Sequence, residues 1–283
     1  MILWLWVFAS SFKAALSLAA VALLLLGCST AVERADRLAA DQGLASHIIQ
    51  GDRFQHKVYS RLLPHAPALH VYLGGDGKPW LQGFFVADDP TPGNALALKM
   101  MASVDYNAVY LGRPCYFGLA STSPCEPIDW THGRYGAEVI GSLHSAVAKL
   151  RKPGQPVLLI GYSGGGALAV LLASQLRGDV SVLTIAANLD TELWTKTHNY
   201  LPLEQSLNPF VDAQLEGKIH RHLAGGRDEN VNSEHAIRFA ERHGGDYEIF
   251  PEFDHVCCWL EQWPQILNSF ISSTAKANTL ETP

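Results

Sequence analysis

Residues 156–169, PVLLIGYSGGGALA, constrain the fold of this chain more than any other stretch. Residues 157–160 form a short apolar run typical of a buried strand, and residues 167–176 favour a helix that follows almost at once. Between them lies Gly161-Tyr162-Ser163-Gly164-Gly165, the pattern G-x-S-x-G. A turn this sharp strains the serine backbone, and side chains two positions either side of the serine would collide. We therefore predict a strand, a tight turn and a helix, with the Ser163 hydroxyl exposed at the positive end of the helix dipole.

Two other interpretations of this turn must be weighed. The glycines would also allow a helix to pack close to a sheet, with Ser163 as the residue that caps the helix. Residues 164–169 satisfy G-x-G-x-x-A as well, a dinucleotide-binding pattern, and the acidic Asp190 follows the next predicted strand. A dinucleotide fold usually places this fingerprint after its first strand, whereas here several strands precede it. The position in the chain therefore favours the exposed serine.

Composition narrows the class of protein. The chain has 283 residues, 48% hydrophobic and 17% charged, which suits one α/β domain with a large core. Its net charge of −6 gives no basic surface for nucleic acid, so no nucleic-acid partner is predicted. His220 and His222 put two imidazoles on one strand face, but no third ligand lies nearby in sequence, so no metal site is predicted.

The N-terminus differs from the rest of the chain. Lys13 is the only charged side chain in residues 1–27, and the apolar run 14–26 leads into Gly27-Cys28, a pattern typical of an export signal. The ending resembles the lipobox of bacterial lipoproteins, which implies a signal peptide over 1–27 and a lipidated Cys28 as mature N-terminus. A linker over 28–44 is expected to follow. An uncleaved membrane anchor is the alternative, and both place the domain outside the cytoplasm.

The lipoprotein resemblance also implies a location. The protein is expected in the bacterial cell envelope, held to a membrane through its N-terminal lipid. Ser29 after the cysteine is similar to lipoproteins sorted to the outer membrane, where the domain would face the periplasm.

Four cysteines remain in the predicted domain, and an oxidising compartment favours disulfides among them. Cys115 and Cys125 bracket a short loop, which favours a local bridge. The adjacent Cys257 and Cys258 would need a strained vicinal bond, so pairing of one of them with Cys115 or Cys125 is the alternative.

Strand and helix patterns alternate along the rest of the chain. Residues 47–62 predict a β-hairpin that turns at Gly51-Asp52. Later strands are expected at 68–73, 107–111, 157–160, 180–186, 218–223 and 247–250, and helices at 95–101, 135–150, 167–176, 233–242 and 260–272. This alternation predicts an α/β protein whose mostly parallel central sheet carries helices on both faces.

The order of these elements resembles the α/β-hydrolase fold. An antiparallel pair comes first, and the G-x-S-x-G turn follows the fifth strand, as in the serine esterases and lipases of that superfamily. The resemblance covers roughly residues 45–273 and implies one hydrolase domain over 45–283. Residues 188–217, an irregular polar and aromatic segment, are expected to form a lid or pocket rim.

The same resemblance implies a catalytic triad, with Ser163 as the nucleophile. Asp228, after the seventh predicted strand, looks like the acid of the family, and His255, after the eighth, resembles its histidine. Asp190, after the sixth strand, is the alternative acid. Residues 73–77, LGGDG, resemble the H-G-x-G turn of the family with glycine in place of histidine, which implies an oxyanion hole of the Asp76 and Gly164 N–H groups.

The resemblance implies a serine hydrolase that cleaves the carboxylic ester of a small acyl substrate, or a thioester or amide, and needs no cofactor. A non-catalytic envelope binding protein that retains the fold is the alternative. Four aromatic residues either line an acyl pocket or pack the loops: Trp130, Trp194, Tyr200 and Trp259.

Overall fold

The structure is a computed structural model that describes residues 29–280. The predicted signal peptide over 1–27 and the predicted lipidation site at Cys28 lie outside these residues. Within 29–280, no helix combines the length and the apolar character needed to cross a bilayer.

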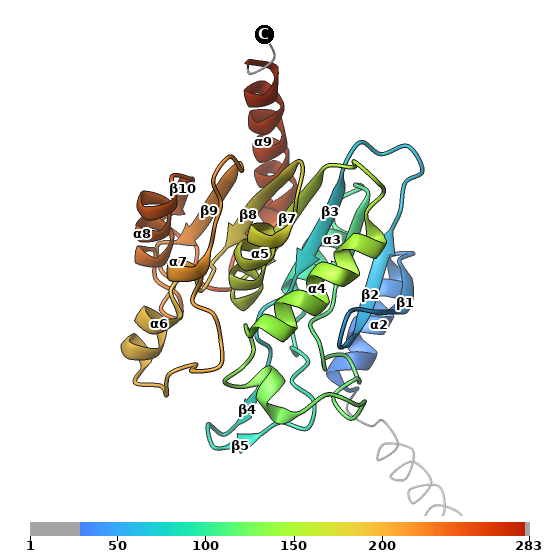
Figure 1. Cartoon of the computed structure of the whole chain (residues 1–283), viewed down its shortest axis with the longest axis vertical. Helices are drawn as coiled ribbons and strands as arrows, with labels where there is room; N and C mark the ends of the chain where they lie inside the picture. Colours follow the sequence, from blue (N-terminus) through green and yellow to red (C-terminus); the bar gives the residue numbers. More distant parts are fainter. Residues whose placement is uncertain (1–28, 281–283) are drawn as a thin grey trace, which may run out of the picture.

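One central sheet organises the molecule. Its strands are β1 (Ala45–Gln50), β2 (Gln55–Arg61), β3 (Leu69–Leu73), β6 (Ala108–Leu111), β7 (Val157–Tyr162), β8 (Val180–Ile185), β9 (His220–Gly225) and β10 (Asp246–Phe250). They lie in the order β1-β2-β6-β3-β7-β8-β9-β10 (Figure 1). β2 pairs antiparallel with both β1 and β6, and every other neighbouring pair is parallel. The mostly parallel sheet with an antiparallel pair first is therefore confirmed.

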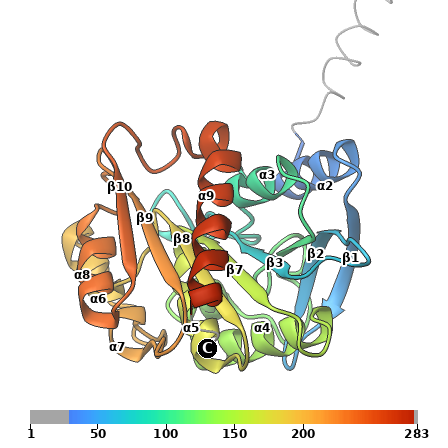
Figure 2. The ribbon, with the colours of Figure 1, turned by 90° about the horizontal axis from the view of Figure 1, so that it is seen from above.

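Helices cover both faces of the sheet. They are α2 (Ala31–Asp41), α3 (Leu96–Ala102), α4 (Ala137–Leu150), α5 (Gly164–Gln175), α8 (Glu234–His243) and α9 (Trp259–Leu280). Figure 2 shows α4 and α5 on one face, and α3 and α9 on the other. Strands β3, β6 and β7 are buried at every position, because their apolar runs contact helices on both sides.

Helix α2 lies within the segment 28–44 that the sequence analysis assigns to a linker. A capping box between Thr30 and Glu33 starts this helix, and its Ala35 and Ala39 are buried in the hydrophobic core. The helix contacts β1 and α3. The folded body therefore includes residues before position 45.

Shorter elements occupy the loops. β4 (Trp80–Leu81) and β5 (Phe85–Val86) form a separate two-stranded hairpin. A 3₁₀ helix spans Pro127–Trp130, and the segment 188–217 contains α6 (Thr191–His198) and α7 (Pro209–Asp212). The loops after β3, β7, β9 and β10 all leave the same edge of the sheet, because these four strands are parallel. That edge carries the residues of the candidate site.

Candidate active site

Ser163 occupies the turn between β7 and α5. Its backbone has φ 55° and ψ −126°, a conformation that is uncommon and strained for a residue with a side chain. Its N–H donates to the carbonyl of Ile185 at 2.9 Å, which holds the turn against β8. A Cβ atom at Gly161 would collide with the Gly165 backbone, and one at Gly165 would collide with the carbonyl of Leu73. The predicted steric need for both glycines is confirmed.

Ser163, His255 and Asp228 form one hydrogen-bonded line. The Ser163 Oγ lies 3.1 Å from His255 Nε2, and His255 Nδ1 lies 2.8 Å from Asp228 Oδ2. The side chain of Asp228 is fully buried, and its Oδ1 accepts the backbone N–H groups of Asn230 and Val231 at 2.9 and 2.8 Å. This geometry places a proton on Nδ1 and leaves Nε2 to accept the serine proton.

The alternative acid, Asp190, lies in a different environment. Its Oδ1 caps α6 by accepting the N–H of Leu193 at 3.1 Å, and its Oδ2 lies 3.7 Å from an Arg238 nitrogen. The structure therefore brings Asp228, and not Asp190, next to His255.

The predicted oxyanion donors lie beside the serine. Gly75 is so close that a Cβ atom there would lie 3.1 Å from the Ser163 Cβ, and Asp76 follows it in the same cavity wall. Neither the Asp76 N–H nor the Gly164 N–H donates to an acceptor within residues 29–280. Both groups are therefore available to a bound oxyanion.

The side chain of Asp76 anchors this loop in a buried charge network. It pairs with Arg113, lies 3.0 Å from an Arg134 nitrogen, and accepts the Tyr135 hydroxyl at 2.8 and 2.7 Å. The Tyr116 hydroxyl donates to the Asp76 carbonyl at 2.8 Å. Burial alone would raise the pKa of Asp76, but the two guanidinium charges and the tyrosine outweigh it and lower the pKa to about 2.

Sequence reasoning did not identify these partners of Asp76. Arg113 and Arg134 come from the long loop after β6, where no periodic pattern or motif marks them. Tyr135 begins the helix predicted over 135–150, but no motif links it to Asp76. The closeness of a single carboxylate to two arginines appears only in three dimensions.

The site opens into a cavity of about 840 Å³. Ser163 and His255 line it, together with apolar and aromatic groups from several loops: Trp80, Phe84, Leu96, Tyr110, Tyr162, Trp194, Tyr200, Leu201 and Leu203. Five residues of the segment 188–217 are among the lining groups, which fits the predicted pocket rim. A cavity of this size can hold a small organic substrate.

The four aromatic residues considered in the sequence divide into two pairs. Trp194 and Tyr200 line the cavity. Trp130 and Trp259 are buried instead, with their indole N–H groups donating to backbone carbonyls at 3.1 and 2.9 Å. The second pair therefore packs the loops.

Asn188 is a cavity residue that sequence reasoning missed. Its side chain is buried, yet neither its Nδ2 nor its Oδ1 has a hydrogen-bond partner among the described residues. A buried polar group without a partner destabilises a fold, so an unpaired amide in a cavity points to a role with a ligand.

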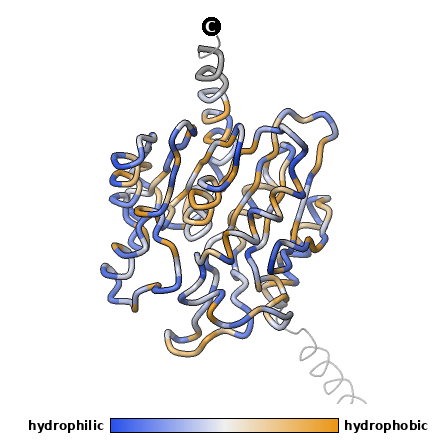
Figure 3. The backbone as a smooth tube through the Cα atoms, in the orientation of Figure 1, coloured by the Kyte–Doolittle hydropathy of each residue, from blue (hydrophilic) through white to orange (hydrophobic). Residues whose placement is uncertain are grey.

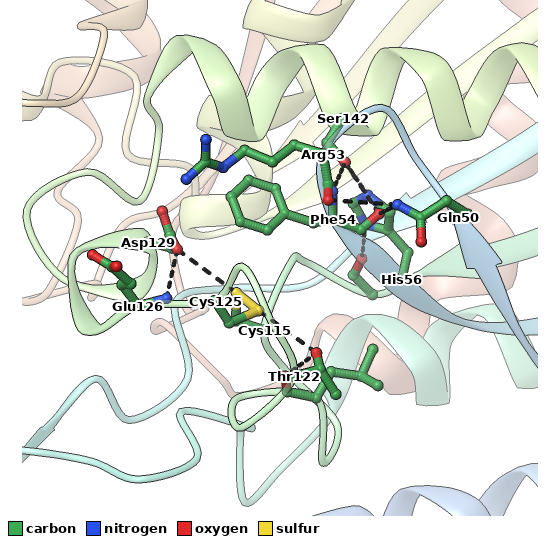
Figure 4. The surroundings of a disulfide bond; sticks show 12 residues. Gln50, Arg53, Phe54, His56, Cys115, Thr122, Cys125, Glu126, Asp129 and Ser142 are labelled. Atoms are coloured by element: carbon green, nitrogen blue, oxygen red, sulfur yellow. Dashed lines mark hydrogen bonds between the residues drawn. A yellow bond between two sulfur atoms is a disulfide. The ribbon is translucent and has the colours of Figure 1, made fainter.

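The cysteines form two local pairs. Cys115–Cys125 closes the loop that precedes the 3₁₀ helix, as expected, and Figure 4 shows Asp129 next to it. Cys257 pairs with Cys258, so the alternative pairing with Cys115 or Cys125 is wrong. The vicinal bond is accommodated with Cys258 at φ 84°. It lies two residues after His255 in the chain.

His220 and His222 belong to a buried network on β9. His220 Nδ1 lies 2.9 Å from His222 Nε2, and His222 Nδ1 lies 2.8 Å from the Thr184 hydroxyl. Burial lowers the pKa of His222 well below its ordinary value, so this ring is neutral.

Comparisons with known proteins address the fold. No protein-family model and no curated protein matches the sequence. An esterase from Pyrococcus furiosus superposes with a TM-score of 0.59 at 14% identity, covering 84% of this chain and 93% of its own. The carboxylesterase CesB of Bacillus subtilis has a TM-score of 0.57 at 13% identity, covering 86% and 97%. A bacterial membrane phospholipase A has a TM-score of 0.56 at 14% identity, covering 94% and 98%.

These neighbours superpose over most of both chains at low sequence identity. A likeness at this level establishes the fold, while activity and substrate have to be argued from the site. The structure and its neighbours together show that this chain has the α/β-hydrolase fold.

Proposed function

We propose that this protein is a serine hydrolase that cleaves a carboxylic ester through an acyl-enzyme. The observation that carries the proposal is the hydrogen-bonded line from Ser163 through His255 to the buried Asp228, at the wall of an apolar cavity. The strained backbone of Ser163 and the two unpaired N–H groups beside it support the same chemistry.

The proposed mechanism gives each group a step. Ser163 Oγ attacks the ester carbonyl carbon while His255 Nε2 takes the hydroxyl proton, and the Asp228 carboxylate stabilises the resulting imidazolium. The N–H groups of Gly164 and Asp76 bind the oxyanion. The tetrahedral intermediate then expels the alcohol, which receives the proton from His255. Water, deprotonated by the same imidazole, attacks the acyl-enzyme and releases the acid.

The test is a substitution at the nucleophile. Ser163→Ala should lower kcat on p-nitrophenyl esters by about 10⁴-fold or more and abolish fluorophosphonate labelling. Ser46→Ala, which changes an exposed serine on β1, should leave both unchanged. A Ser163→Ala chain that is still labelled would refute the mechanism. If the unmodified protein hydrolyses no ester of any chain length and is not labelled by fluorophosphonate, a non-catalytic binding protein would be favoured.

We further propose that Cys28 carries lipid and holds the domain on a membrane of the bacterial envelope. The lipobox-like end of the leader supports this proposal. Only Ser29 and Thr30 separate Cys28 from α2, which begins at Ala31. The anchor would therefore hold the hydrolase domain directly at the membrane surface.

A further inference from the structure

The β4–β5 hairpin exposes an unusual concentration of apolar side chains. No charged residue occurs from position 79 to position 87, PWLQGFFVA. Phe84 and Phe85 are 84% and 66% exposed, and Leu81 is 48% exposed. Single exposed apolar residues are normal on a protein surface, but a contiguous group of them marks an interaction site.

A second apolar segment lies beside this hairpin. Tyr200 and Leu201 are 55% and 72% exposed. His132 connects the two segments, because its ring contacts the Trp80 ring at a centroid distance of 5.8 Å and its Nδ1 lies 3.1 Å from the Pro202 carbonyl.

Both segments contribute residues to the wall of the cavity that contains Ser163. We call their exposed residues the apolar rim: Leu81, Phe84, Phe85, Val86, Tyr200 and Leu201. The rim therefore lies next to residues that line the site. Figure 3 shows hydrophobic colouring along the hairpin, at the lower end of the view.

The start of the described chain lies at the same end of the molecule. Arg34, in the first turn of α2, donates to the carbonyl of Ser29. A Cβ atom at Gly93 would lie 3.6 Å from the Arg34 guanidinium and 3.8 Å from the Lys78 ammonium, and Lys78 immediately precedes the uncharged hairpin segment. Figure 1 shows the start of α2 and the hairpin together at the lower end, with α9 leaving the opposite end.

We propose that the apolar rim docks on a lipid bilayer and that the site draws its substrate, an acyl ester of a membrane lipid, from that bilayer. The proposal that the rim docks on a bilayer depends only on the exposed apolar surface. The proposal that the substrate is a membrane lipid rests on the proposed ester hydrolase as well. Apolar side chains of such a surface insert into the boundary between headgroups and acyl chains, and the neighbouring Arg34 and Lys78 attract anionic headgroups.

A bilayer fits this surface better than a protein partner does. Both segments of the rim contribute to the cavity wall, so a protein docked on them would cover that side of the site. A bilayer would instead deliver acyl chains through the mouth to Ser163. The start of α2 lies at the same end of the molecule as the hairpin, which adds a reason, because a lipid on Cys28 would hold that end against the membrane.

Docking can be measured without catalysis. The full chain with Ser163→Ala is reconstituted in phosphatidylcholine and phosphatidylglycerol vesicles, with or without bromine on the acyl chains. Phe85→Trp adds a fluorophore on the rim, and Tyr247→Trp adds one on β10, at the far edge strand of the sheet. We expect brominated lipid to quench the emission gained at position 85 and to leave that gained at position 247 unchanged. Equal emission from position 85 in both kinds of vesicle would overturn the docking proposal.

The substrate class is tested with charged variants of the rim. Leu81→Asp with Phe85→Asp adds two charges at residues that do not line the cavity, and Ile48→Asp with Tyr247→Asp adds two at similarly exposed residues on the edge strands. In anchored protein, the rim variant should hydrolyse vesicle phospholipid about tenfold more slowly or worse, because each apolar side chain loses its favourable insertion. Both variants should hydrolyse p-nitrophenyl acetate like the unmodified protein.

Failures of the two proposals are distinguishable. An unmodified protein that cleaves p-nitrophenyl acetate but not vesicle lipid would refute only the membrane substrate. Quenching at position 85 in an unmodified protein without any esterase activity would refute the hydrolase and the membrane substrate, and would leave the docking proposal standing. A rim variant that changes the protein from a dimer to a monomer in sedimentation, with no quenching at position 85, would assign the rim to a second copy of the chain and overturn the proposal.

Discussion

Asp76 contributes both its backbone N–H and its carboxylate to the candidate site. Its backbone N–H has no acceptor among residues 29–280, while its carboxylate is fixed by Arg113, Arg134 and Tyr135. A buried carboxylate is stable only when such partners neutralise it, so the network that satisfies the charge also fixes the backbone. The N–H group that we propose as an oxyanion donor is therefore positioned by the side-chain contacts of its own residue.

This network predicts a specific loss of stability in acid. The pKa of Asp76 is lowered from 3.8 to about 2 in the folded chain, so its contribution to stability is complete above pH 4 and is lost as the pH falls through 2. That contribution amounts to about 2 kcal/mol. Urea unfolding should show the free-energy difference between the unmodified chain and Asp76→Asn shrinking by this amount between pH 5 and pH 2.

Asp105→Asn provides the matched control, because the Asp105 side chain is 97% exposed. The difference in unfolding free energy between Asp105→Asn and the unmodified chain should vary far less over the same pH range. An Asp76→Asn difference that stays constant from pH 5 to pH 2 would contradict the ion-pair account.

Replacing Asn188 by an apolar residue should raise the stability of the fold and lower its activity on esters. Its buried amide has no partner among the described residues, so Asn188→Leu should raise the free energy of unfolding by about 1–3 kcal/mol. The same change should lower kcat/KM on esters by up to about tenfold, if the amide supplies the hydrogen bond to the substrate that its missing partner suggests. Denaturant unfolding and ester kinetics on one protein preparation measure both effects.

Asn107 is the control for Asn188. It is also buried, but its side chain accepts the Leu63 N–H at 2.9 Å and donates to the Ala68 carbonyl at 2.8 Å. Asn107→Leu should therefore destabilise the fold. If both leucine variants destabilise it equally, the Asn188 amide is structural.

At the scale of elements, the long buried strands were the easiest to predict. β7 is an apolar run that is buried at every position, and β8 is buried at all positions but one, so each had few alternatives to a buried strand. The β4–β5 hairpin escaped prediction because each strand has two residues and is largely exposed, so no alternation of apolar and polar side chains exists. Its turn at Gln82 and Gly83, both with positive φ, is the local signal that could have identified it.

Helices α6 and α7 begin at residues typical of helix N-termini, but their segment is too polar to show an apolar helical pattern. Asp190 caps the first, and Asn208 followed by Pro209 starts the second. The residue weighed as a catalytic acid is thus a helix cap. The cysteine pairs show a similar limit, because spacing alone did not exclude the pairing of Cys257 or Cys258 with the distant loop.

At the scale of the whole molecule, sequence order predicted the sheet because parallel strands require crossover helices and bring their following loops to one edge. The resemblance to a family then singled out Ser163, Asp228 and His255, which the structure brings into contact. The resemblance could not predict the charge network around Asp76, the unpaired amide of Asn188 or the apolar rim. Each of these depends on loops that meet only in the folded chain.

The placement of the whole molecule on a membrane gives the last prediction. The four cysteines of the domain are paired in disulfides, so a fatty acid linked through sulfur would have to be carried by Cys28. Bacteria that express the full chain with an alkyne-tagged fatty acid should tag the unmodified protein and leave Cys28→Ala untagged. Ser163→Ala should remain tagged, which separates an anchor from an acyl-enzyme.

The same experiment tests how the anchor and the apolar rim act together. Stable membrane attachment usually needs two signals, and here an N-terminal lipid and the rim would lie at one end of the molecule. Cys28→Ala should therefore lose membrane retention more completely when Leu81→Asp and Phe85→Asp are added. A Cys28→Ala protein that is tagged as strongly as the unmodified one, or a mature chain that begins elsewhere than Cys28, would contradict the proposed anchor.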